Sequence, residues 1–163
     1  MTVEYQHSKD VDIFAIEQLE KLCFDKNAWS KNMILESAQS GRTIFFFAIQ
    51  TNEVNFALEN NLIGYCAIDD LIFEAELLRI CVHPQYRKKG IGEGLLLFAI
   101  NHLKKSSNQE EQNQKSITLE VNATNYPAQG LYQKCGFNPI AIRKNYYKEE
   151  GFSADAIIMQ LFV

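Results

Sequence analysis

The segment from Arg87 to Glu93 combines three adjacent cations with two glycines, a composition suited to binding phosphate. It lies where one hydrophobic run ends and another, with helical spacing, begins. The first N–H groups of a helix have no partner inside it, and its dipole adds roughly half a positive charge there. Glycines let a ligand approach the backbone closely. The segment therefore predicts a pyrophosphate cradle, although a tight turn with a solvated basic face would use the same residues. The residues of this turn are Arg87, Lys88, Lys89, Gly90, Ile91, Gly92 and Glu93.

Two common nucleotide-binding motifs do not fit this turn. A Rossmann fingerprint requires glycine where Leu95 stands, and its strand opens the fold, whereas three antiparallel strands are expected before this turn. A P-loop requires a Gly-Lys-Ser or Gly-Lys-Thr ending, but Gly92 is followed by Glu93 and Gly94. Neither motif therefore explains the turn.

Thiol and imidazole side chains are too scattered to predict a metal site. The cysteines form no C-x-x-C pair, and no two histidines are four residues apart. We expect reduced thiols and no bound metal. Cys135, on the apolar face of a predicted helix beside Gly136, is expected to be a buried, inert thiol rather than a covalent nucleophile. The residues considered are Cys23, Cys66, Cys81, Cys135, His7, His83 and His102.

The composition is that of an ordinary globular domain. With 47% hydrophobic and 22% charged residues, the 163-residue chain is close to the globular average, so disordered, collagen-like and membrane-spanning classes find no support. We expect one domain over residues 1–163. The net charge of -4 argues against general nucleic-acid binding. Because Met1 to Asp10 contains no apolar signal core, we expect a cytoplasmic protein, with a monomer favoured.

Hydrophobic periodicity predicts an α/β fold. The expected order is strand, two helices, three strands, helix, strand, helix and two strands, which gives a mixed sheet with helices on both faces. The expected strands lie at Thr2 to Tyr5, Thr43 to Gln50, Leu62 to Asp69, Glu74 to Val82, Ile117 to Asn122, Phe137 to Tyr146 and Ala154 to Phe162. The expected helices begin near Ile13, after Ser30, at Gly90 and at Pro127.

Caps and loops complete this prediction. Ser8 or Asp10 is expected to cap the first helix and Ser30 the second, which Gly41 would end in a left-handed conformation. The polar segment Thr51 to Asn61 is interpreted as an enlarged hairpin loop, and Ser106 to Lys115 as an exposed loop.

Three sets of residues resemble the GNAT superfamily of N-acetyltransferases. Arg87, Gly90 and Gly92 resemble motif A of that family. Residues that resemble motif B are Leu119, Glu120, Val121, Asn125, Ala128, Leu131, Tyr132, Gly136 and Phe137. The tail and one loop are similar to the RimI group of bacterial ribosomal-protein-alanine N-acetyltransferases, through Ile142 to Tyr147, Asp155 to Met159, Trp29 and Ser30. The matches extend over essentially the whole chain, and the two enlarged loops depart from the family pattern.

The resemblance implies acetyl-CoA as cosubstrate, held in a cleft between two splayed central strands. Glu120 lies on the polar side of a strand whose Ile117, Leu119 and Val121 form the apolar side, and the resemblance makes it the general base, acting through a water. Tyr132 is then the acid that protonates the CoA sulfur. An ordinary solvated strand residue and a core tyrosine are the structural alternatives.

The resemblance also assigns cofactor and acceptor contacts. Backbone groups of Ile80, Cys81 and Val82 would pair with the pantetheine arm like an added strand, and one N–H would polarise the thioester. Asn125 would hydrogen-bond that arm, although a capping or turn asparagine fits nearly as well. We expect the carboxylate of Glu93 to point away from the pyrophosphate. An acceptor groove lined by the aromatic residues Trp29, Tyr146 and Tyr147 is a weaker prediction, since each also suits half-buried packing.

The functional hypothesis is acetylation of the α-amino group of a ribosomal protein by direct transfer in a ternary complex. Acetylation of a small amine, such as a polyamine or an aminoglycoside, and a non-catalytic acyl-CoA-binding module are the alternatives. The presence of both Glu120 and Tyr132 argues against the non-catalytic module.

Overall fold

The computed structural model describes residues 1–8, 10–51, 61–106, 114–149 and 152–163. In this part of the chain, seven strands form one sheet in the order β1-β2-β3-β4-β5-β7-β6, antiparallel except between β4 and β5. The strands are β1 (Thr2–Ser8), β2 (Thr43–Thr51), β3 (Leu62–Asp70), β4 (Glu74–Val82), β5 (Ser116–Asn122), β6 (Asn138–Glu149) and β7 (Phe152–Phe162). The helices are α1 (Ile13–Phe24), α2 (Lys31–Gln39), α4 (Ile91–Ser106) and α5 (Tyr126–Lys134), with short 3₁₀ turns at Asp25–Asn27 and Pro84–Tyr86. The predicted mixed α/β fold and its element order are confirmed.

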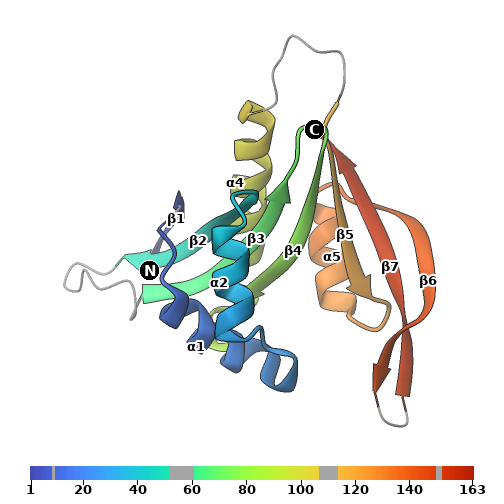
Figure 1. Cartoon of the computed structure of the whole chain (residues 1–163), viewed down its shortest axis with the longest axis horizontal. Coiled ribbons are helices and arrows are strands. Elements are labelled where there is room, and N and C mark those ends of the chain that lie inside the picture. The colour runs from blue at the N-terminus through green and yellow to red at the C-terminus, as the bar shows by residue number, and fades with distance from the viewer. Residues whose placement is uncertain (9, 52–60, 107–113, 150–151) are drawn as a thin grey trace.

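Helices cover both faces of the sheet, as expected. In Figure 1, α1 and α2 lie in front of the sheet, and α4 and α5 lie behind it. Consecutive phenylalanines on β2 show why β2 is apolar throughout. Phe45 and Phe47 pack with α1 and α2, whereas Phe46 packs with α4, because successive strand residues point to opposite faces. No helix in the described part of the chain is long and apolar enough to cross a membrane.

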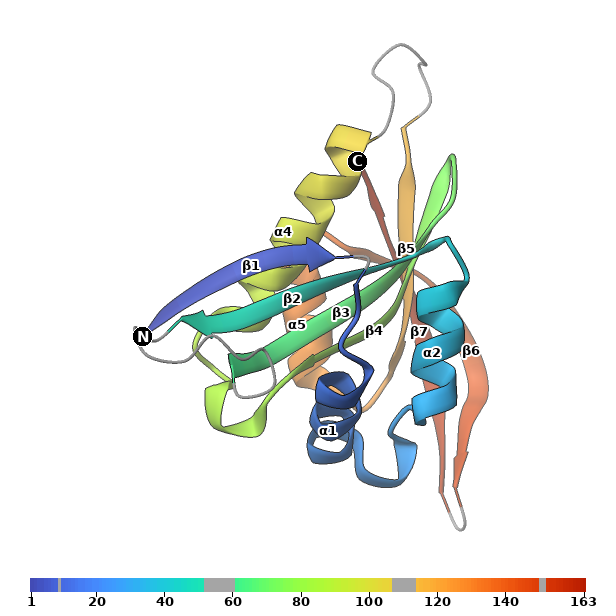
Figure 2. The same cartoon turned by 60° about the vertical axis from the view of Figure 1, so that its left-hand side comes forward.

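The sheet opens between its two parallel strands. Only Glu74 to Leu77 of β4 pair with β5, opposite Ser116 to Leu119. Between β3 and β4 the register shifts at this point, so that Leu78 is an extra residue on β4, which is the mark of a β-bulge. The ribbons of β4 and β5 diverge beyond the paired residues in Figures 1 and 2. One edge of the last part of β4 therefore lacks a strand partner among the described residues.

The helix ends test the predicted caps. Asp12, rather than Ser8 or Asp10, caps α1, and its Oδ1 accepts from the Ala15 N–H at 3.0 Å. Asp10 is two residues too early, because a cap must directly precede the first helical residue. Ser30 caps α2 as predicted, accepting from Met33 N–H at 3.3 Å. Gly41 is left-handed as predicted, with φ 76°.

The two predicted polar loops are largely not described. Residues 52–60 and 107–113 lie outside the described residues. The expectation that Ser106 to Lys115 is exposed throughout is wrong for Lys115, which is buried. Its ammonium pairs with Asp70 at the end of β3, and its backbone exchanges two hydrogen bonds with Val163. A lysine is tolerated in a buried position when its charge is paired in this way.

Candidate active site

The basic turn before α4 has the geometry of an anion site. Lys88 and Gly90 both adopt left-handed conformations, with φ 59° and 77°. The first amide of the helical hydrogen-bond pattern is that of Gly94, which donates to Gly90 O at 2.9 Å. Backbone N–H groups of Lys88 to Glu93 have no acceptor among the described residues. Alternating left-handed residues at a helix start form a concave set of free donors suited to a phosphate group.

Side chains of the turn make separate contacts. Arg87 Nε donates to the carbonyl of Val82 at 3.0 Å, which fixes the turn to the end of β4. Lys89 Nζ lies 5.2 Å from the centre of the Tyr86 ring. The carboxylate of Glu93 lies 3.8 Å from Lys134 Nζ on α5, so a cation offsets the one negative charge in the turn.

Glu120 lies on the sheet face that α1 and α2 cover elsewhere. The predicted alternation of β5 is confirmed, since Ile117, Leu119 and Val121 are buried against α4 and α5, and Glu120 is half-buried on the other face. Its Oε1 lies 2.6 Å from Nη1 of Arg143, an exposed residue of β6. The two side chains meet across β7, because β7 lies between β5 and β6.

Sequence reasoning missed Arg143 as a partner of Glu120. The residue belongs to the tail that resembles the family, but its pairing depends on the registers of β5 with β7 and of β7 with β6. These registers cannot be predicted from the spacing of residues in the sequence.

Tyr147 lies near the Glu120 carboxylate, and Tyr132 lies near Tyr147. Burial raises the pKa of Tyr147, and the negative charge of Glu120 raises it further. Burial also raises the pKa of Tyr132 far above its usual value, with smaller contributions from Cys66 and Tyr147. The Tyr132 hydroxyl has no hydrogen-bond partner in the described residues, among which no side-chain N or O atom is both fully buried and unpaired. Its hydroxyl therefore reaches space that solvent can enter, in a protonated form that can donate.

The remaining site residues divide between the two sides of the opening. Tyr146 is exposed on β6, 5.2 Å from the Tyr147 ring, and the guanidinium of Arg143 lies 5.5 Å from its ring centre. Trp29 lies on the other side, against Arg79 of β4. The three aromatic residues therefore lie on both sides of the opening, and the groove that they would line stays a prediction.

Residues assigned to the pantetheine arm lie along the opening. Ile80, Cys81 and Val82 pair with β3 on one edge only, and their other edge has no strand partner among the described residues. Asn125 caps α5, because its Oδ1 accepts from the Ala128 N–H at 3.2 Å. The Nδ2 of Asn125 donates to no described residue, and its predicted hydrogen bond to the arm stays a prediction.

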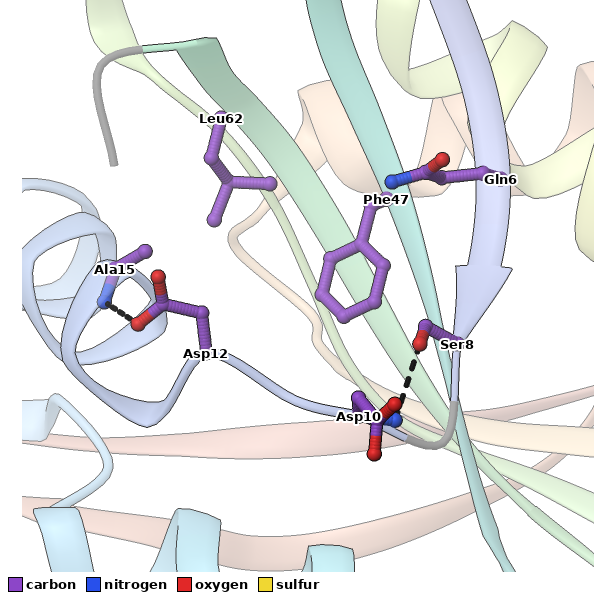
Figure 3. A pocket seen from close by; sticks show the side chains of 7 residues that line it. All are labelled: Gln6, Ser8, Asp10, Asp12, Ala15, Phe47 and Leu62. Carbon is purple, nitrogen blue, oxygen red and sulfur yellow. Dashed lines mark hydrogen bonds between the residues drawn. The ribbon is translucent and has the colours of Figure 1, made fainter. Parts of the chain in front are cut away.

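A separate pocket lies away from this site. It has a volume of about 140 Å³ and lies between the end of β1, the middle of β2, the start of β3 and the start of α1. Figure 3 shows that Asp12 in this pocket is turned to its capping bond with Ala15. Because Phe47 of β2 forms its wall, the pocket is several strands away from Glu120.

The structure gives no support for metal or covalent-cysteine chemistry within the part of the chain that it describes. No group of three or more metal-ligating side chains is present in these residues. All four cysteines are free thiols. Cys135 is buried, and burial raises its pKa to about 11, which keeps it a protonated, unreactive thiol.

Comparisons of the sequence and of the structure with known proteins identify acetyltransferases as relatives of this chain. Residues 42–139 match the acetyltransferase (GNAT) domain family. The chain is 32% identical over 148 residues to the putative [ribosomal protein bS18]-alanine N-acetyltransferase of Bacillus subtilis, covering 91% of this chain and 87% of the relative. The crystal structure of the ribosomal-protein-S18-alanine N-acetyltransferase from Escherichia coli superposes with a TM-score of 0.82 at 28% identity, covering 99% of this chain and 94% of that one. Arabidopsis thaliana NAA60 in complex with acetyl-CoA shares the fold, with a TM-score of 0.82 at 16% identity over 99% of each chain. The free amides before α4, the opening between β4 and β5 and the family match together show that this chain belongs to the GNAT family of acetyltransferases.

Proposed function

We propose that this acetyl-CoA-dependent N-acetyltransferase acetylates the α-amino group of the N-terminal alanine of ribosomal protein bS18. The observation that carries the proposal is the position of Glu120 at the open end of β5, on the same sheet face as Arg143 and near Tyr147. The acceptor is the one for which the bacterial relatives are named.

The free amides of Lys88 to Glu93 and the unpaired edge of β4 fit the two parts of acetyl-CoA. The amides would hold its diphosphate, and the backbone of Ile80 to Val82 would align its arm as an added strand. Acetyl-CoA supplies an already activated thioester, so the protein needs to orient it and manage two protons. One β4 amide would polarise the thioester carbonyl.

Glu120 and Tyr132 are suited to those two proton transfers. A free α-amine has a pKa of about 8, so it is partly neutral in the cell and a carboxylate acting through a water can complete its deprotonation. Arg143, at 2.6 Å, fixes the orientation of the Glu120 carboxylate. Tyr132 has a raised pKa, remains protonated at neutral pH and would donate to the leaving sulfur.

The shape of the acceptor side favours a polypeptide over a small amine. In Figure 1, none of the helices in the described part of the chain lies in front of β5, β7 and β6, whereas α1 and α2 cover the strands beside them. Arg143 and Tyr146 on this open face are exposed. An open face suits an extended chain, whereas a small amine is usually enclosed in a pocket.

The test is acetyl transfer to a peptide that carries the N-terminus of bS18. Mass spectrometry should place one acetyl group on the α-amine, and an N-terminally blocked peptide of the same sequence should remain unmodified. A panel of polyamines and aminoglycosides should be poor acceptors. Labelling of lysine alone, or preference for a small amine, would contradict the proposal.

Variants test the proposed base. Glu120→Gln should lower turnover by about two to four orders of magnitude, because a general base is lost, with CoA binding retained. Glu76→Gln is the matched control, since Glu76 is an exposed carboxylate of β4 beside the β5 residue Thr118. Equal activity of both variants would reject the assignment of Glu120.

A further inference from the structure

Glu20 is a fully buried carboxylate that the proton transfers do not use. It projects from α1 beside the core residue Leu19, and its exposed fraction is 0%. Burying a charge is unfavourable unless it is paired and hydrogen-bonded. The partners of Glu20 therefore indicate what it holds together.

Those partners come from three separate segments. Arg79 of β4 donates to Glu20 through Nη2 at 2.6 Å and through Nε at 3.0 Å. Tyr65 of β3 donates its hydroxyl at 2.6 Å. The third segment is the α1–α2 connection, residues Asp25 to Ser30, whose Trp29 N–H donates at 2.6 Å. One carboxylate thus joins two strands of the sheet to the connection between the first two helices.

Arg79 makes a second attachment to the same connection. Its Nη2 also donates to the carbonyl of Asn27 at 2.6 Å. Its guanidinium carbon lies 3.5 Å from the centre of the Phe24 ring and 5.5 Å from that of Trp29. The ion pair therefore holds the connection through two hydrogen bonds, at Trp29 N–H and at the Asn27 carbonyl, beside the packing of the Trp29 ring against the core.

The ion pair stands at one side of the opening in the sheet. Arg79 lies beyond Leu77, where β4 no longer pairs with β5, and two residues before Cys81. The connection is therefore held on the β4 side of the opening, while Glu120 and Arg143 lie on its β5 and β6 side. The connection and the Glu120–Arg143 pair therefore lie on opposite sides of the opening.

We propose that Glu20 and Arg79 are positioning residues that hold the Asp25 to Ser30 connection as one wall of the acceptor site. The inference depends on the proposed function for the identity of the acceptor. It assigns to the pair an effect on acceptor affinity, separate from cosubstrate binding and from the proton transfers.

Trp29 allows the attachment to be measured without activity, because it is the only tryptophan of the chain. Arg79→Met should shift Trp29 emission to longer wavelength and raise its quenching by acrylamide about twofold. Arg42→Met is the matched control. Arg42 also pairs with a carboxylate at 2.6 Å, that of Asp69 near the end of β3, but within the described residues it makes no hydrogen bond with the connection, so Trp29 emission should not change.

Kinetics test the effect on the acceptor. With the bS18 peptide, Arg79→Met should raise the acceptor KM about tenfold and change the acetyl-CoA KM and kcat less than about twofold. Arg79→Lys keeps the charge but cannot donate to Glu20 and Asn27 through a planar fork, so it should show a smaller effect of the same kind and serves if Arg79→Met does not fold.

The possible failures are distinguishable. An unchanged acceptor KM in both variants, with an active wild-type protein, would overturn this inference alone, as would unchanged Trp29 fluorescence. A wild-type protein that acetylates no peptide α-amine would overturn the proposed function and the acceptor wall with it. Equal increases of both KM values would show a general structural defect and would also overturn the inference.

Discussion

Gly94 is packed so closely that replacing it with alanine should destabilise the protein, although alanine favours helices. A Cβ at Gly94, in the first turn of α4, would lie 2.6 Å from Cζ of Tyr5 and closer still to its hydroxyl. The Tyr5 ring has little freedom to move. It stacks on Phe98 with ring centroids 6.2 Å apart, and its hydroxyl donates to Ile91 O at 3.5 Å.

The magnitude follows from two opposing effects. Overpacking of this kind costs about 1–3 kcal/mol. Alanine gains up to about 1 kcal/mol over glycine in a helix. Because the contact is with a constrained ring, we expect Gly94→Ala to lose about 2 kcal/mol, or about 4–8 °C in Tm. Gly130→Ala in α5 should gain up to about 1 kcal/mol, since no atom lies within 4 Å of its added Cβ.

Urea unfolding, monitored by circular dichroism, measures the stability changes of Gly94→Ala and Gly130→Ala as shifts in the unfolding midpoint at constant m-value. The contact with Tyr5 can be removed by Tyr5→Val. In that background, adding Gly94→Ala should be neutral or stabilising relative to Tyr5→Val alone. The steric reasoning would be refuted if Gly94→Ala were as destabilising with valine at position 5, or if Gly130→Ala were destabilising by the same amount.

Three further predictions concern charged and titrating groups. Lys115→Met should lower the free energy of unfolding by about 3 kcal/mol in urea titrations, because it leaves Asp70 unpaired, and adding Asp70→Leu should recover most of the loss. The thiol of Cys81 on β4 donates a hydrogen bond to Cys23 and lowers the pKa of Cys23 to about 7. Iodoacetamide at pH 7.5 should therefore alkylate Cys23 before Cys135, whose pKa burial raises to about 11; the reverse order in peptide mapping would contradict this. Burial lowers the pKa of His102 below its ordinary 6.5, so the unfolded state binds the proton more readily. Stability should fall as the pH drops below about 6.5, and His102→Gln should show a smaller decline over that range.

Local pattern predicted the elements and the faces of the strands well. The alternation of β5 placed Ile117, Leu119 and Val121 in the core and Glu120 on the other face, because a period of two leaves no other arrangement for a strand with one buried face. The turn before α4 could be predicted because glycine and helix-start rules are local.

Long-range pairing could not be predicted from the sequence. The Glu20–Arg79 ion pair joins residues 59 positions apart, and Glu120 meets Arg143 across an intervening strand. Both depend on strand order and register. Lys115 was expected in an exposed loop because its neighbours are polar, and its burial depends on an aspartate 45 residues away.

The parallel join between β4 and β5 is four residue pairs long, yet it links strands β1 to β4 with the group formed by β5, β7 and β6. A molecule that forms hydrogen bonds with the free edge of β4 extends this short seam. Binding of such a molecule therefore also stabilises the contact between the two groups of strands. An acyl donor bound there as proposed would act as a missing length of the sheet, and its departure after each turnover would return the seam to its weakest state.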